Sequence, residues 1–177
     1  MKTRFSENRR LGATVLAAAI VLSLMLSGGG GLMRERVQAE AVFYAAQNIN
    51  TDLAERAEAA FNIWNASTDI AAESTLQRVE DAREALLGAK SIAERYRANV
   101  ELDAAVGALM NELDDANLSA EDSRFVDGQY AAFTAFATTI ARSEYNEIAG
   151  AFNAKLGAFP ANLIGMLAGV RALEQFG

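Results

Sequence analysis

A single proline, Pro160, interrupts a chain of 177 residues that contains 37 alanines. Proline breaks helices and alanine forms them best, so this combination constrains the fold more than any other feature of the sequence. Apolar residues recur at intervals of three and four, as in Leu53, Ala57, Ala60 and Trp64, and no strand-like alternation of useful length appears. The sequence therefore predicts an all-α fold, an antiparallel bundle of about four helices with an N-terminal transmembrane helix.

Capping residues divide this pattern into helices. Ser119, which precedes carboxylates in the first turn, is the clearest start, and Ser91 or Lys90 is expected to begin the helix before it. Thr51 or Asp52 is expected to cap an earlier helix, with Glu55 completing a capping box. Further breaks are expected at residues 65–69, Gly88, residues 114–117, residues 143–144 and Gly157 with Pro160. The large side chains expected to form the core are Phe61, Trp64, Phe125, Phe133, Phe136, Phe152 and Phe159.

Residues 11–33 form a stretch without a charge, preceded by ten residues of net charge +3. As a helix this stretch would span roughly 35 Å, enough for the hydrocarbon core of a bilayer. The basic flank predicts a cytoplasmic N-terminus. A cleaved signal peptide is the alternative, because Ser27 and Gly29 are small residues placed as at a cleavage site. We favour an anchor, which divides the chain into a cytoplasmic segment (1–10), a transmembrane anchor (11–33) and an extracytoplasmic bundle (34–177).

Residue types that are missing or unfavourably placed exclude several chemistries. The chain has no cysteine and no histidine, which removes disulfides, thiol chemistry and imidazole-based catalysis or metal binding. Residues 34–177 have a net charge of −10, which argues against a nucleic-acid partner. The adjacent acid pairs, such as Asp114 and Asp115, point about 100° apart on a helix and do not converge on one metal ion. We therefore expect no catalytic, cofactor-binding or metal-binding residues, and no enzyme.

The C-terminal region is the most distinctive part of the sequence. Tyr145, Asn146, Phe152 and Asn153 have offsets of 0, +1, +7 and +8, which places them two turns apart on one helical face. Either the asparagine amides bond neighbouring backbone beside buried rings, or these are ordinary edge residues. The apolar segment 163–176 is too short and interrupted for a second membrane span. We expect it to pack back on the bundle, with the membrane or a partner as the alternative location.

This C-terminal string resembles the ending typical of the LemA family. The positions that match the family pattern are Ala141, Arg142, Tyr145, Asn146, Phe152, Asn153, Phe159, Pro160 and Asn162. Leu32, Glu35 and Val37 are similar to the family's opening after its anchor, and Asp52, Leu53 and Arg56 are faintly similar to a second motif. The resemblance implies a single-pass, extracytoplasmic helical bundle from a bacterium, with no established catalytic activity.

Two functions of different classes remain after these exclusions. The leading hypothesis is a membrane-anchored, non-enzymatic scaffold or interaction protein of the bacterial cell envelope. The alternative is an extracytoplasmic ligand-binding or sensor bundle that acts through a partner, with a pocket lined by Tyr96, Tyr130 and arginines. An enzyme that uses two carboxylates is a third class without support from residue spacing. The predicted partners are the lipid bilayer, a membrane or envelope protein and, as a possibility, further copies of the chain; no cofactor is predicted.

Overall fold

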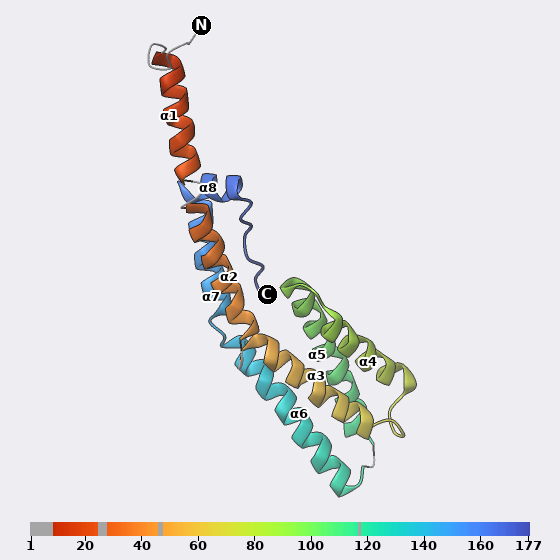
Figure 1. The fold of residues 1–177 in the computed structure, drawn as a ribbon. Coiled ribbons are helices and arrows are strands. Elements are labelled where there is room, and N and C mark those ends of the chain that lie inside the picture. The colour runs from red at the N-terminus through yellow and green to blue at the C-terminus, as the bar shows by residue number, and fades with distance from the viewer. Residues whose placement is uncertain (1–8, 25–27, 46–47, 117) are drawn as a thin grey trace. The chain divides into compact units, whose positions relative to one another are not determined.

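The computed structural model describes residues 9–24, 28–45, 48–116 and 118–177. Within these ranges the chain forms eight helices and no strand (Figure 1), which confirms the all-α prediction. The expected number of about four helices was too low. The helices are α1 (Arg9–Leu24), α2 (Gly30–Tyr44), α3 (Ile49–Ala66), α4 (Glu73–Gly88), α5 (Ile92–Asp114), α6 (Ala120–Ala141), α7 (Tyr145–Gly157) and α8 (Ala161–Ala168).

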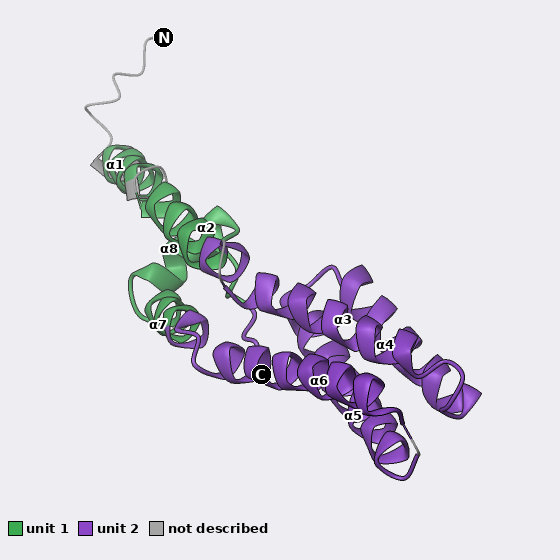
Figure 2. Ribbon diagram, turned by 90° about the horizontal axis from the view of Figure 1, so that it is seen from below, with its two compact units in different colours: residues 1–40, 148–173 green, residues 41–147, 174–177 purple. Residues whose placement is uncertain are grey.

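Two compact units divide the chain, as Figure 2 shows by colour. Unit 1 comprises residues 1–40 and 148–173, and unit 2 comprises residues 41–147 and 174–177. Helices α2 and α7 each contribute residues to both units, because the division falls inside them.

Unit 2 is built around the four helices α3 to α6. Helix α3 packs against α4, α5 and α6, and α4 packs against α5. Leu53 and Ile63 on α3, Leu102 and Leu109 on α5 and Phe133 on α6 are almost completely buried. The predicted four-helix bundle therefore corresponds to this unit. The sequence analysis did not predict the remaining helices as separate elements.

The large aromatic side chains are less central to the core than predicted. Phe133 and Phe152 are buried, but Phe61, Phe125 and Phe159 are 37%, 48% and 83% exposed, so the prediction was wrong for these three. Many helix positions are alanine, and a spacing of three and four then fits more than one face of a helix. The pattern consequently does not identify which face turns inward.

Most predicted helix ends are confirmed. Ser91 caps α5 in a capping box with Glu94, and the hydroxyl of Ser119 accepts a hydrogen bond from the backbone N–H of Asp122 at the start of α6. The exception is α3, whose N-cap is Asn48 instead of Thr51 or Asp52. The backbone N–H groups of both predicted caps donate to the Asn48 carbonyl, which places these residues inside the first turn.

Glu112 on α5 fastens the start of α4. Its carboxylate accepts hydrogen bonds from the backbone N–H of Ala72, at 3.0 Å, and from the Thr75 hydroxyl. Both hydrogen bonds stabilise the ionised carboxylate and lower the pKa of Glu112. The bond from Thr75 has the larger effect and the bond from Ala72 the smaller.

Unit 1 packs α8 onto the glycine run that precedes α2. A methyl group added at Gly29 would lie 2.7 Å from the Ala168 Cβ, and one added at Gly28 would lie 3.2 Å from Ile164 side-chain atoms. Glycine is therefore required at position 29 for this close approach. The Lys155 ammonium and the Glu35 carboxylate form a further contact at 2.6 Å.

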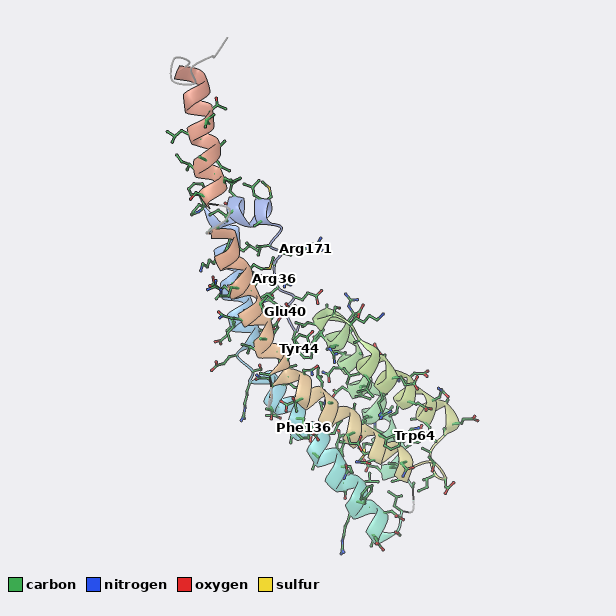
Figure 3. The ribbon with its side chains drawn as sticks, viewed as in Figure 1. Arg36, Glu40, Tyr44, Trp64, Phe136 and Arg171 are labelled. Atoms are coloured by element: carbon green, nitrogen blue, oxygen red, sulfur yellow. The ribbon has the colours of Figure 1, made fainter. Side chains whose placement is uncertain are left out.

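Arg36 links α2 to the segment that follows α8 in unit 1. Its guanidinium forms an ion pair with Glu40 at 2.8 Å and donates to the Arg171 carbonyl at 3.0 Å. These residues are labelled in Figure 3.

The predicted transmembrane anchor coincides with α1 and the start of α2. Among the described residues, no helix combines the length and apolar character needed to cross a bilayer. Residues 25–27 of the predicted anchor, and residues 1–8 of the predicted cytoplasmic segment, lie outside the described residues. The anchor stays a prediction.

Glu112→Gln is expected to lower the free energy of unfolding at neutral pH, because a neutral amide accepts the two hydrogen bonds less strongly. A depressed folded-state pKa contributes stability above the unfolded-state value, near 4.3 for glutamate, that is lost as pH falls through the folded-state pKa. The difference between wild type and variant should therefore shrink as pH drops below about 4.3. Chemical denaturation at several pH values measures this, with Glu58→Gln, at an exposed position in the middle of α3, as the control. A difference that is constant with pH would contradict the prediction.

Candidate functional site

The C-terminal tail, defined as residues 170–177, is extended and follows α8. Gly169 ends α8 in the left-handed conformation, with φ of 69°, which favours glycine. Val170, Leu173 and Phe176 of the tail are buried. The segment 163–176 thus divides at Gly169, and the part after it packs back on the protein as expected.

In unit 2 the amide of Asn146 pairs with the backbone of Phe176. Its Nδ2 donates to the Phe176 carbonyl and its Oδ1 accepts from the Phe176 N–H, both at 2.8 Å. A side-chain amide has the same donor and acceptor as a peptide group, so it satisfies both polar groups of a residue that has no strand partner.

Asn153 forms the same arrangement in unit 1, seven residues further along α7. Its Nδ2 donates to the Leu173 carbonyl at 2.9 Å and its Oδ1 accepts from the Leu173 N–H at 2.7 Å. The asparagine amides therefore bond backbone, one of the two interpretations open from the sequence. The backbone belongs to the C-terminal tail.

Aromatic rings in unit 2 hold the tail on its apolar side. The Tyr145 hydroxyl donates to the Glu174 carbonyl at 2.6 Å. The Phe176 ring lies 5.8 Å from that of Phe43 and 5.3 Å from that of Tyr96, and Phe43 also packs edge-on against Tyr145 at 5.2 Å. Such ring pairs add about 0.5–1.5 kcal/mol each beyond burial.

The other motif residues have different surroundings. Phe152 is buried, whereas Arg142 and Phe159 are exposed. Pro160 precedes α8, and the Asn162 Oδ1 accepts only a local hydrogen bond, from the Leu163 N–H at 2.7 Å. The structure thus brings Tyr145, Asn146 and Asn153 onto the tail and leaves Arg142, Phe159 and Asn162 at the surface.

Arg142 borders a hollow of about 370 Å³ in unit 2, together with Asp52 and Glu144. Burial, with Glu55 nearby as the smaller cause, raises the pKa of Asp52. Within the part of the chain that the structure describes, no three acidic side chains gather in a group that could hold a metal ion.

A buried arginine, Arg56, lies at the centre of unit 2. Its guanidinium donates to the side chains of Asn99 and Asp103 and stacks 4.0 Å from the centre of the Phe133 ring. Burial lowers the pKa of Arg56, and Asp103 opposes this effect. Sequence reasoning assigned Arg56 no role, although a charge at a core position of the stripe Leu53, Arg56, Ala60 and Ile63 could have indicated it.

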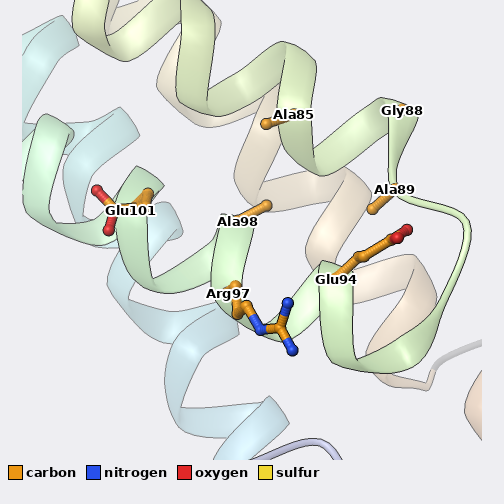
Figure 4. A pocket seen from close by; sticks show the side chains of 7 residues that line it. All are labelled: Ala85, Gly88, Ala89, Glu94, Arg97, Ala98 and Glu101. Carbon is orange, nitrogen blue, oxygen red and sulfur yellow. The ribbon is translucent and has the colours of Figure 1, made fainter.

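A groove of about 530 Å³ runs between α4 and α5 (Figure 4). Three of its seven lining residues are alanine, and Glu94 and Glu101 lie at opposite ends of it. Glu94 is also engaged in the capping box of α5, where it accepts from the Lys90 and Ser91 N–H groups. The groove therefore does not bring two carboxylates together as hydrolytic chemistry requires.

The tyrosines expected to line a ligand pocket are used in packing. Tyr96 packs edge-on against Phe176, and Tyr130 stacks on Phe133 with ring centres 6.4 Å apart. Tyr96 and Tyr130 therefore do not provide the pocket lining that would have favoured a ligand-binding function.

Fold and site together define an all-helical protein whose C-terminal tail is held along a helix by paired asparagine amides. A scan against protein-family models matches residues 45–177 to the LemA family, and the chain belongs to this family. The resemblance seen in the C-terminal string is thereby confirmed. Searches of curated proteins and of solved structures found no match.

Asn153→Ala is expected to release the tail locally. The Leu173 N–H would lose its acceptor, and the tail residue would exchange two hydrogen bonds for solvent at a cost of about 1–3 kcal/mol. Hydrogen exchange should accelerate at Leu173, and the midpoint of thermal unfolding should fall. Asn162→Ala is the matched control, because this motif asparagine bonds only its neighbour. Equal effects of both variants would contradict a tail-holding role.

Arg56→Lys is expected to destabilise unit 2 by about 2–3 kcal/mol, because lysine keeps the charge but loses the planar fork and the stacking on Phe133. Asp103→Asn should cost clearly less, since the Asp103 side chain is 64% exposed and solvent screens its charge. Urea denaturation of both variants measures the difference. A lysine variant as stable as wild type would show that only the charge matters.

Proposed function

We propose that this LemA-family protein is a membrane-anchored, non-enzymatic interaction module of the bacterial cell envelope. Its N-terminus would be cytoplasmic and its helical body extracytoplasmic. Residues 11–33 would contact the lipid bilayer, and the helical body, residues 34–177, would bind a protein partner.

The observation that carries the proposal is the surface of α1. Val15, Leu16, Ile20, Val21 and Leu22 are between 47% and 63% exposed. At 100° per residue these positions lie all around the helix, so exposed apolar side chains point to every side of α1 between Val15 and Leu22. A helix that is apolar all round is characteristic of burial, and lipid is the medium that would bury it.

The body supports an interaction role over a catalytic one. Its most distinctive residues, Tyr145, Asn146 and Asn153, hold the tail of the same chain, so their hydrogen-bonding groups are already used. The large polar surface of unit 2, with a net charge of −12, suits a solvated domain that binds a partner.

Membrane fractionation tests the anchor. The full chain is expected to sediment with membranes and to resist an alkaline wash, and Leu16→Arg with Ile20→Arg should move it to the soluble fraction. Each arginine costs about 2.5–3.5 kcal/mol at the centre of a membrane helix. Val100→Arg with Phe125→Arg, two exposed apolar residues of unit 2, is the matched control. Wild-type protein in the soluble fraction, or an intact mass that lacks the first 29 residues, would contradict the anchor.

The interaction role needs a separate experiment. A photoactivatable residue at exposed positions of unit 2, in native membranes, should give adducts with a defined neighbour at some positions and none at others. Full-length protein that is recovered only as an uncrosslinked monomer at every position would contradict it.

A further inference from the structure

Helix α8 turns its large apolar side chains outward. Phe159, Leu163, Met166 and Leu167 are 83%, 48%, 70% and 45% exposed. Leu163, Met166 and Leu167 are spaced by three and four residues, which places them along one stripe of α8, and Phe159 lies just before the helix. A helix at a water-exposed surface normally has the opposite arrangement, with large apolar residues inside.

The opposite face of α8 consists of Ile164, Gly165 and Ala168, which contact the protein. Ile164 and Ala168 lie against Gly28 and Gly29, and Gly165 is buried against Leu156. Because Gly28 and Gly29 belong to the charge-free stretch 11–33, α8 lies beside the C-terminal end of the predicted anchor. Both elements belong to unit 1.

Charge is distributed so that the surroundings of α8 are basic. Residues 148–173 contain Lys155 and Arg171 and no acidic residue, and Arg34 on α2 is exposed. Beyond residue 33, unit 1 contains four basic residues and two acidic ones, Glu35 and Glu40. Lys155 and Arg36 form ion pairs with these two carboxylates, and the other two basic residues, Arg34 and Arg171, are exposed. An anionic lipid surface attracts nearby lysine and arginine side chains and repels carboxylates.

We propose that α8, with Phe159, is an interfacial helix that inserts its exposed stripe into the anionic bilayer next to the anchor. Phe159, Leu163, Met166 and Leu167 would enter the boundary between headgroups and acyl chains, as the apolar faces of interfacial helices do. Arg34 and Arg171 would contact phosphate groups of the lipids. This inference rests on the proposed anchor, since the anchor places α8 at the membrane.

Lipid fits the stripe better than a second copy of the chain. In a symmetric dimer through α8, the exposed Arg34 and Arg171 of one copy would approach those of the other, and like charges would oppose each other. A bilayer contributes both the apolar layer and the anionic charge that this surface lacks.

Spin labelling of the full chain tests the proposal, because the chain has no cysteine and single labels need no further change. Leu163→Cys and Met166→Cys carry the label on the stripe. Leu16→Cys reports the anchor, and Glu121→Cys on exposed α6 is the aqueous control. The labelled protein is reconstituted in vesicles of phosphatidylcholine with 30% phosphatidylglycerol, as a typical anionic fraction. Collision of the label with oxygen, which concentrates in lipid, is compared with collision with a water-soluble nickel chelate.

The stripe labels should show an oxygen-to-nickel collision ratio between those of Leu16→Cys and Glu121→Cys, several-fold above the aqueous control. In vesicles of phosphatidylcholine alone the ratio at Met166→Cys should fall. A lipid-exposed anchor label with an aqueous ratio on the stripe would overturn the inference and leave the anchor standing. An aqueous ratio at Leu16→Cys as well would overturn both. Dipolar broadening between stripe labels of two chains would overturn the lipid assignment in favour of a dimer.

Discussion

The extended C-terminal tail has backbone N–H and carbonyl groups that form no hydrogen bonds within a helix or a strand. The arrangement of the C-terminal motif residues depends on providing hydrogen-bond partners for these groups. Asn146 and Asn153 provide them by pairing side-chain amides with the N–H and carbonyl groups of Phe176 and Leu173. Once the backbone is satisfied, apolar side chains of the tail become buried at low cost. Phe176 can then join the rings of Phe43 and Tyr96 in unit 2. The family motif is thus explained by packing and hydrogen bonding within the chain.

A second constraint shapes unit 1, where α8 approaches the backbone of the glycine run. Close approach requires small residues on the inner face of α8, and Gly29 faces the Ala168 Cβ without room for a methyl group. Of the large residues of α8, Ile164 lies on the inner face, and Leu163, Met166 and Leu167 lie on the outer face. The exposed stripe of α8 and the exposed apolar side chains of α1 belong to the same unit. Lipid is the common explanation that we propose for both.

Sequence reasoning located helix ends well and the inward faces of helices poorly. Serine caps act locally, so Ser91 and Ser119 could be recognised from their immediate neighbours. The exposure of Phe61 and Phe125 depends on which face α3 and α6 turn to their neighbours, and alanine-rich helices leave that choice open. The amides of Asn146 and Asn153 were recognised as candidates to bond backbone, but their partner lies 20 to 30 residues away and no local pattern identifies it. Arg56 was named only as a faint match to a family motif, and its buried contacts were not predicted, since its partners come from α5 and α6.

The sequence by itself determined that the chain is helical, that it has no thiol or imidazole chemistry, and that its ending is typical of the LemA family. These properties follow from residue types and short spacings, which act within one or two helical turns. Only the tertiary structure decided what the motif holds, which aromatic residues are buried and which face of α8 is exposed. Those outcomes depend on contacts between residues far apart in the chain, because hydrogen bonds and close packing form only where the fold brings the groups within a few ångströms.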